Sequence, residues 1–484
     1  MYASGVPFGI LIDTKGPRWS VMIGAISLAC GYFPLWSAYN NGPESMSVGT
    51  LSFFSFLTGM GSCSAFSGAI KVSASNWPHH RGSATAFPLS GFGLSAFVFT
   101  MISTFAFPDD TSRFLLMLAI GTFGLVFVGM LFLRMIPPAS PYQAIPTEEG
   151  GRPNHPRKNS SELQKSVSKH SRHGSIDDPG TFPSSSASSC LHHMYTYMNM
   201  LPTQHHTVIP SANDVDETSS LLSASSDTPN KSTTDPQDGH SHSHKPDITG
   251  WALVKAGSFW KLFILLGLLC GVGLMTINNI GNNAKTLWHH FDQNAGHDFI
   301  QSKQLMHVSI LSIASFAGRL SSGIGSDVVV KKLHSSRYWS LVASSLIFVL
   351  AQVCGLSIEN PNYLFLLSGL SGLGYGALFG VFPALVADAF GAKGLGINWG
   401  AMTMSPVISG NIFNLAYGTI LDSHSGPVDG HDRLCQDGKS CYSAAYSITL
   451  VASVVGVAWS LWCVWHEARE KRRASKDFLT AHDA

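Results

Sequence analysis

The amino-acid sequence predicts an all-α membrane protein, because long uncharged apolar runs make up most of the chain. Only 12% of the 484 residues are charged, whereas soluble domains average about 25%. A helix needs roughly 20 such residues to cross a bilayer, and nine of the eleven uncharged runs have at least 20, which excludes a soluble globular enzyme. The eleven runs are 1–12, 19–43, 45–70, 82–108, 114–133, 262–284, 304–318, 338–358, 360–387, 394–421 and 442–466.

The two shorter runs also predict helices. Run 304–318 ends only because Arg319 interrupts an apolar pattern that continues to Ile324. Run 1–12 is cut off by the start of the chain. Before Asp13 it has neither the basic n-region nor the small-residue cleavage site of a signal peptide. We therefore expect eleven transmembrane helices.

A strongly polar block separates the fifth predicted helix from the sixth. It is rich in Ser, Thr, Pro, His, Asn and Asp, so it cannot bury enough apolar surface to offset the entropy of ordering its chain. Ten of the 21 histidines lie in it, but they form no closed ligand set, and neither a metal nor another cofactor is predicted. The expected domains are a five-helix bundle, this disordered loop, a six-helix bundle and a tail: 1–136, 137–249, 250–466 and 467–484.

Lys and Arg collect in alternate loops, and this asymmetry predicts the side that each loop faces. The central loop and the C-terminal tail are expected to face the cytosol, and loops 285–303 and 422–442 the opposite side. Cys435 and Cys441 lie in the second of these loops, where oxidation to a disulfide is permitted. Two free thiols are the alternative.

Two segments at the predicted cytosolic ends of the first and seventh helices resemble each other. One is Gly9-Ile-Leu-Ile-Asp13-Thr-Lys-Gly16-Pro-Arg18 and the other is Gly323-Ile-Gly-Ser-Asp327-Val-Val-Val-Lys331-Lys332. Both have the pattern G-x-x-x-D followed by cations, and parallel six-helix repeats of this kind build many transporters.

The two aspartates are therefore predicted to form a gate between the bundles. We expect Asp13 near Arg18 or near the start of the tenth helix around Gly394. Asp327 is expected near Arg319 or at the mirrored place around Gly82. In a partly desolvated loop such a pair can hold two bundles together and still open, because exposed ion pairs contribute only about 0–1 kcal/mol.

The first segment resembles the loop signature of the major facilitator superfamily between its second and third helices. The second segment matches the corresponding loop between the eighth and ninth helices of that fold. It lacks a glycine at the position equivalent to Gly16. The chain thus corresponds to helices two to twelve of that fold, and a mis-called start, a truncated isoform or a fragment is favoured over a true eleven-helix transporter. Within the superfamily it looks most like the nodulin-like and monocarboxylate-transporter-homologue branch of fungi and plants. The resemblance lies in residues 1–7, 81–96 and 271–281.

Arg319 is the cation that this resemblance singles out. Monocarboxylate transporters carry an arginine at this place, where it is associated with the substrate carboxylate and with coupling, and a guanidinium pairs a carboxylate bidentately. One turn earlier that family has an acidic residue, whereas this chain has Ser315, which weakens the analogy for proton coupling. The alternative is that Arg319 belongs to the gate with Asp327.

Further candidates for the substrate path are polar residues within the predicted helices, because such groups face the bundle or a wet cavity. His307 is either wetted from the non-cytosolic mouth or a titrating group. The asparagines could contact a substrate or bond between helices; they are Asn278, Asn279, Asn282, Asn398, Asn411 and Asn414.

The predicted function is secondary active transport of a small solute by alternating access, with a monocarboxylate or another organic anion as the suggested substrate and a proton as the suggested coupling ion. A non-transporting membrane sensor or scaffold with the same fold is the alternative, whereas the chain lacks the motifs of a membrane enzyme. The lipid bilayer is the other partner. A net charge of +1 gives no field for nucleic acid, and a monomer is expected.

The central loop contains Glu217-Thr-Ser-Ser-Leu221-Leu222, which resembles an acidic dileucine sorting signal. Together with the resemblance to vacuolar homologues, this signal predicts the vacuolar membrane as the location. The plasma membrane is the second choice.

Overall fold

The computed structural model describes residues 2–42, 45–107, 110–136, 247–428, 432–435 and 437–482. The chain divides into two compact units, one made of Met1–Ala139 with His242–Ala484 and the other of Ser140–Ser241. All elements below belong to the first unit. The predicted disordered loop, apart from its last three residues, and the predicted sorting signal lie outside the described residues.

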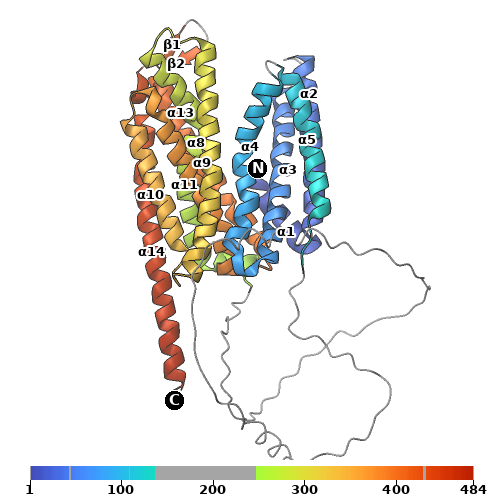
Figure 1. Ribbon diagram of the computed structural model, residues 1–484, viewed down its shortest axis with the longest axis vertical. Coiled ribbons are helices and arrows are strands. Elements are labelled where there is room, and N and C mark those ends of the chain that lie inside the picture. The colour runs from blue at the N-terminus through green and yellow to red at the C-terminus, as the bar shows by residue number, and fades with distance from the viewer. Residues whose placement is uncertain are drawn as a thin grey trace, which may run out of the picture. The chain divides into compact units, whose positions relative to one another are not determined.

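In the described part of the N-terminal half, every regular element is a helix (Figure 1). Gly16 ends the first helix at a φ of +94°, a conformation that favours glycine, and Pro17 begins the next helix, where its fixed φ is suited. The Oγ of Ser47 caps the third helix by accepting from the Thr50 amide at 3.3 Å. The elements are η1 (Tyr2–Ser4), α1 (Gly5–Lys15), α2 (Pro17–Asn41), α3 (Val48–Asn76), η2 (Pro78–His80), α4 (Arg81–Ala106) and α5 (Thr111–Phe132).

The C-terminal half is also helical, with one short antiparallel hairpin in which Gly426 pairs with Leu434. Its helices are α7 (Trp251–Lys255), α8 (Gly257–Phe291), α9 (His297–Lys331), α10 (Tyr338–Ser357), η4 (Pro361–Tyr363), α11 (Leu364–Phe390), α12 (Leu395–Met402), α13 (Met404–His424), η5 (Gly438–Cys441) and α14 (Ser443–His482), and its strands are β1 (Gly426–Val428) and β2 (Asp432–Leu434).

The predicted class of all-α membrane protein is confirmed. Among the described residues, nine helices are long and apolar enough to cross a membrane. The other two predicted runs correspond to α1, which has only 11 residues, and to α12 with α13, which are separated at Thr403. The prediction of one uninterrupted helix over 394–421 was therefore wrong.

The last helix is longer than the sequence predicted. Residues 467–482 continue α14, although 467–484 was expected to be a tail beyond the bundle. Two contacts between successive turns support this extension. Lys471 Nζ lies 2.8 Å from Glu467 Oε1, and the Arg469 guanidinium lies 4.6 Å from the centre of the Trp465 ring.

The two halves differ in how much of their surface they bury. In the C-terminal half, α8 and α11 carry the largest buried share among the predicted spans, and large side chains such as Phe348, Phe382 and Trp399 are almost fully enclosed. In the N-terminal half, α4 and α5 bury few of their apolar side chains. Apolar exposure on spanning helices is expected where the solvent is lipid.

Candidate gate and transport path

Asp13 joins the end of α1 to the first turn of α12. Its carboxylate oxygens accept hydrogen bonds from the backbone amides of Gly396 at 3.2 Å and Ile397 at 2.8 Å. The first amides of a helix have no partner within that helix and carry a partial positive charge, so a carboxylate is stabilised there. Lys71 on α3 completes the contact, because its Nζ lies 2.9 Å from Asp13 Oδ1 and also donates to the Ala392 carbonyl at 2.8 Å.

Asp327 forms the mirrored contact from α9 to the first turn of α4. One carboxylate oxygen accepts from the Gly82 amide at 3.1 Å, and the other accepts from the amide and the hydroxyl of Ser83 at 2.7 and 2.8 Å. Arg337 Nη1 pairs with the same carboxylate at 2.8 Å. Each half therefore contributes one aspartate that caps a helix of the other half.

A second carboxylate extends the contact on the Asp327 side. Arg337 Nε lies 2.7 Å from Asp388 Oδ2, and Arg81 Nη1, from α4, lies 3.0 Å from Asp388 Oδ1. Asp388 thus ties the start of α4 to α10 and α11. Arg81, Arg337 and Asp388 were not among the sequence-predicted site residues.

Of the alternatives that the sequence left open, the structure places Asp13 at the start of α12 and Asp327 at the start of α4. Arg18 instead donates from Nε to the Leu133 carbonyl at 2.7 Å, within the N-terminal half. The Asp327–Arg337 pair is more deeply buried than the partly desolvated gate pair that the sequence predicted. Asp327 is only 4% exposed and Arg337 8%, because the two helix ends close over them, and removing one partner of a buried pair costs about 3–5 kcal/mol.

Glycines allow the same two helix pairs to pack backbone against backbone. A Cβ added at Gly396 of α12 would lie 2.9 Å from the Gly9 carbonyl oxygen of α1, and a Cβ added at Gly82 of α4 would lie 2.6 Å from the Gly323 carbonyl oxygen of α9. Small residues permit such close approach of membrane helices. The repeat glycines Gly9 and Gly323 therefore lie in equivalent contacts between the halves.

Arg319 lies two turns from Asp327 along α9 and is buried. Its Nη1 donates to the Leu89 carbonyl of α4 at 2.7 Å. The guanidinium carbon lies 5.2 Å from the ring centre of Phe92 and 5.9 Å from that of Phe379, distances suited to cation–π attraction. The side chain thus joins the two halves in this conformation.

Three of the predicted asparagines gather between α8 and α13. The amide nitrogens of Asn278 and Asn279 lie 3.4 and 3.0 Å from Asn414 Oδ1. Asn282 is exposed, and Asn411 is exposed with its amide nitrogen donating to the Val407 carbonyl of its own helix. The structure therefore brings together half of this group.

Asn398 and His307 are buried instead. The Asn398 amide nitrogen donates to the Ile248 carbonyl at 2.9 Å and so anchors the segment that precedes α7. His307 is 1% exposed, and its Nδ1 lies 3.0 Å from Ser368 Oγ on α11. The interpretation of His307 as a residue wetted from the mouth was wrong, because α11 covers its ring.

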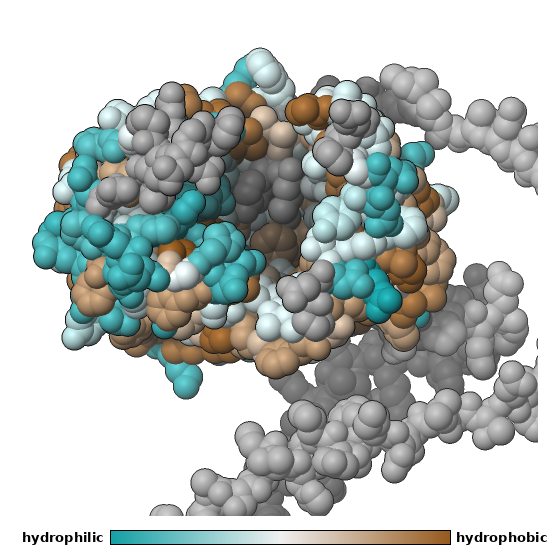
Figure 2. All heavy atoms as spheres, turned by 90° about the horizontal axis from the view of Figure 1, so that it is seen from above, coloured by the Kyte–Doolittle hydropathy of each residue, from teal (hydrophilic) through white to brown (hydrophobic). Residues whose placement is uncertain are grey.

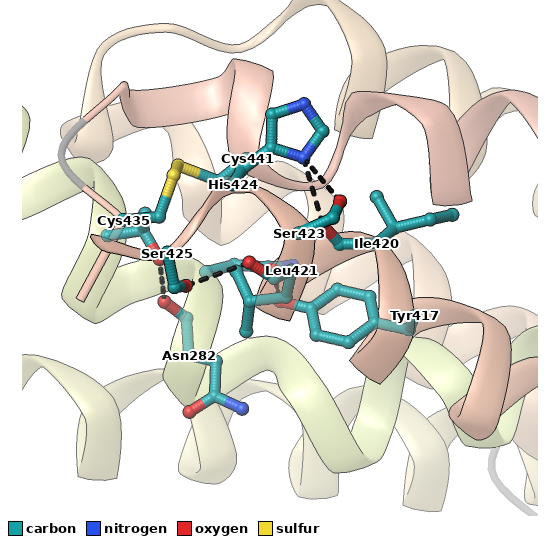
Figure 3. Close-up of a disulfide and its surroundings, with 11 residues drawn as sticks. Asn282, Tyr417, Ile420, Leu421, Ser423, His424, Ser425, Cys435 and Cys441 are labelled. Atoms are coloured by element: carbon teal, nitrogen blue, oxygen red, sulfur yellow. Dashed lines mark hydrogen bonds between the residues drawn. A yellow bond between two sulfur atoms is a disulfide. The ribbon is translucent and has the colours of Figure 1, made fainter. Parts of the chain in front are cut away.

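Cys435 and Cys441 form a disulfide with a Cα–Cα distance of 6.0 Å. It links the residue after β2 to the end of η5, beside the C-terminal end of α13 (Figure 3). Nearby, Lys439 Nζ donates to Glu359 Oε1 at 2.6 Å. This hydrogen bond and the lysine charge hold the pKa of the Glu359 carboxyl below its usual value. Among the described residues, no cluster of three or more His, Cys, Asp or Glu side chains is arranged to hold a metal ion.

The face that carries the β1–β2 hairpin is hollowed between the two halves, with apolar residues visible inside (Figure 2). The aspartate contacts lie at the opposite end of the helices, where α1 meets α12 and α4 meets α9 (Figure 1). The described helices are thus joined at one end and separated at the other.

Several known proteins are similar to this chain. Residues 3–150 match the family described as Nodulin-like. The chain is 29% identical to the uncharacterized membrane protein YMR155W of Saccharomyces cerevisiae over 98% of this chain and 87% of that protein. It is 23% identical to the probable transporter mch1 of Neurospora crassa over 94% of this chain and 79% of that protein. Among solved structures, the human organic anion transporter MFSD10 aligns with a TM-score of 0.49 at 12% identity, over 94% of this chain and 80% of that one.

Proposed function

We propose that this chain is a nodulin-like transporter of the fungal type within the major facilitator superfamily and that it moves a small solute by secondary active transport with alternating access. The observation that carries the mechanism is the mirrored pair of carboxylate caps, Asp13 on α12 and Asp327 on α4. Both cross from one half to the other, and both lie at the same end of the helices.

These caps can act as a reversible latch. When the halves rock apart at this end, each aspartate leaves the helix amides of the other half, and water replaces those amides. Each aspartate keeps a cation from its own half, because Lys71 lies on α3 beside Asp13 and Arg337 lies next to α9 beside Asp327. Opening therefore breaks the contacts between the halves without leaving either carboxylate unpaired. The free-energy cost of opening thus stays small enough for the binding energy of the solute to offset it.

We infer that the solute is an organic anion, such as a monocarboxylate, and that Arg319 binds it. In the closed arrangement the guanidinium donates to the Leu89 carbonyl of the other half. A solute carboxylate competes for the same donor and offers a charged acceptor, which makes stronger hydrogen bonds than a neutral carbonyl. Binding would then weaken a contact between the halves and so favour opening. A proton gradient is the proposed driving force.

Uptake into proteoliposomes tests this substrate class. We expect saturable, pH-gradient-dependent uptake of small monocarboxylates and no uptake of the primary amides of the same acids. Arg319→Gln should lower uptake at least tenfold, whereas Lys332→Gln, a neutralisation at an exposed position, should leave it unchanged. Equal uptake of a carboxylate and its amide would contradict the assignment of an anion.

We propose the vacuolar membrane as the location, with the segment Glu217–Leu222 as the signal. The double change Leu221→Ala with Leu222→Ala should redirect a fluorescently tagged full-length protein to the plasma membrane. The matched control replaces Ser219 and Ser220 with alanine, because these positions separate the acidic residue from the leucines without belonging to the signal. Vacuolar fluorescence that persists without the leucines would remove the signal from the account.

A further inference from the structure

A groove outside the transport path lies between the end of α3 and the start of α4. Its volume is about 400 Å³, and it is lined by Ser73, Trp77, His80, Ser83, Ala84 and Phe87. The two aromatic side chains are among the more exposed in the chain, with Trp77 63% and Phe87 65% accessible. The wall therefore combines two exposed aromatic rings with the hydroxyls of Ser73 and Ser83 and the ring of His80, a mixture of apolar and polar groups that suits a membrane interface.

A cation from the other half lies beside His80, one of the residues that line this groove. Lys331 Nζ, at the end of α9, lies 2.9 Å from His80 Nε2. Ile324 and Val328 precede Lys331 by seven and three positions, so they share its helix face, and both are partly exposed. Two exposed apolar side chains of α9 therefore lie on the same helix face as the Lys331 ammonium.

We propose that this groove binds a phospholipid with an anionic headgroup. The phosphate would accept hydrogen bonds from Lys331 Nζ and from the His80 ring, and an acyl chain would lie against Trp77 and Phe87. Charge complementarity selects an anion, because Lys331 is exposed at the mouth. The apolar wall selects a lipid over a free phosphate. The first amides of α4 are already bonded to Asp327, so the contacts to phosphate come from side chains.

Such a lipid would stabilise the closed gate. Ser83 lines the groove and also donates from its hydroxyl to Asp327 at 2.8 Å, while Lys331 belongs to the C-terminal half. A phosphate held by both His80 and Lys331 therefore spans the contact that must open during transport. Basic residues beside a spanning helix attract anionic lipids electrostatically.

Native mass spectrometry of the full-length protein tests this inference without a transport assay. The protein is released from nanodiscs that contain phosphatidylserine and phosphatidylcholine with identical acyl chains. We expect at least tenfold preferential retention of phosphatidylserine. Lys331→Gln should abolish the preference, and its neighbour Lys332→Gln should keep it. Phe87→Ala should lower retention, whereas Phe132→Ala, at an even more exposed apolar position on α5, should not.

Three outcomes would overturn the lipid site. They are equal retention of the two lipids by the unmodified protein, an equal loss of preference in the two lysine variants, and displacement of bound phosphatidylserine by inorganic phosphate or glycerophosphoserine at the concentration of the lipid itself. Lys331 and Phe87 are exposed, so these variants are expected to fold; an unchanged melting temperature checks this.

Discussion

Asp327→Asn is expected to slow solute uptake at least tenfold while leaving the protein folded and inserted in the membrane. The change removes the charge that pairs with buried Arg337 and weakens the acceptor for the amides of Gly82 and Ser83. Loss of one partner of a buried pair costs about 3–5 kcal/mol, and each 1.4 kcal/mol is a tenfold change in a population. Asp388 also pairs with Arg337, which reduces the cost but does not abolish it.

The closed end should therefore be populated less, and hydrogen exchange of the first turn of α4 should accelerate. Asp13→Asn should act in the same way on the first turn of α12, because Asp13 occupies the equivalent place. Asp298→Asn is the matched control, since this residue is an exposed acid in the first turn of α9. If uptake and exchange are unaffected by neutralising either Asp13 or Asp327, these residues serve only to cap helices and fix the topology.

Gly82→Ala is expected to keep the closed end from forming. The new methyl group would lie 2.6 Å from the Gly323 carbonyl oxygen and 2.7 Å from Asp327 Oδ1, so α4 and α9 must move apart. Overpacking of this kind costs about 1–3 kcal/mol, and here the cost falls on the closed arrangement alone. Uptake should fall roughly five- to a hundredfold, and exchange in the first turn of α4 should rise.

Gly91→Ala is the control on the same helix, because a Cβ at Gly91 meets nothing within 4 Å. Both changes raise helix propensity by about 1 kcal/mol, so a difference between them reports packing between the halves. Gly9→Ala should repeat the effect at the contact of α1 with α12. Uptake that is the same for Gly82→Ala and Gly91→Ala would show that close packing of α4 on α9 is not needed for transport.

The sequence predicted the parts of this molecule that depend on local pattern. Uncharged runs locate spanning helices because the bilayer demands them, and the repeated G-x-x-x-D segments placed Asp13 and Asp327 at equivalent positions. The same logic failed for α12 and α13, because a break at Thr403 leaves the apolar composition unchanged. The uncharged-run criterion also failed for the extension of α14. This charged segment is stabilised as a helix by pairs of side chains on successive turns.

The partners of the two aspartates could not be predicted in the same way. Lys71 and Arg337 indicated only the orientation of the loops, because nothing local shows that their side chains turn inward. Lys71 meets Asp13 across 58 positions of sequence, and Asp388 meets Arg81 across 307. The burial of His307 likewise depends on α11, whose Ser368 follows it by 61 positions. Only the packing of distant helices decides these contacts.

A reversible cross-link across the closed end tests alternating access most directly. His80 and Lys331 belong to different halves and meet at 2.9 Å. The full-length protein would carry His80→Cys and Lys331→Cys, keep the Cys435–Cys441 disulfide and have its remaining cysteines replaced by serine. A short, reducible bifunctional thiol reagent should then abolish uptake, and a reductant should restore it.

The control pair, Glu359→Cys with Lys439→Cys, lies within the C-terminal half at the other end, and its cross-link should leave uptake intact. Full uptake by the protein cross-linked between positions 80 and 331 would show that this end does not open during transport.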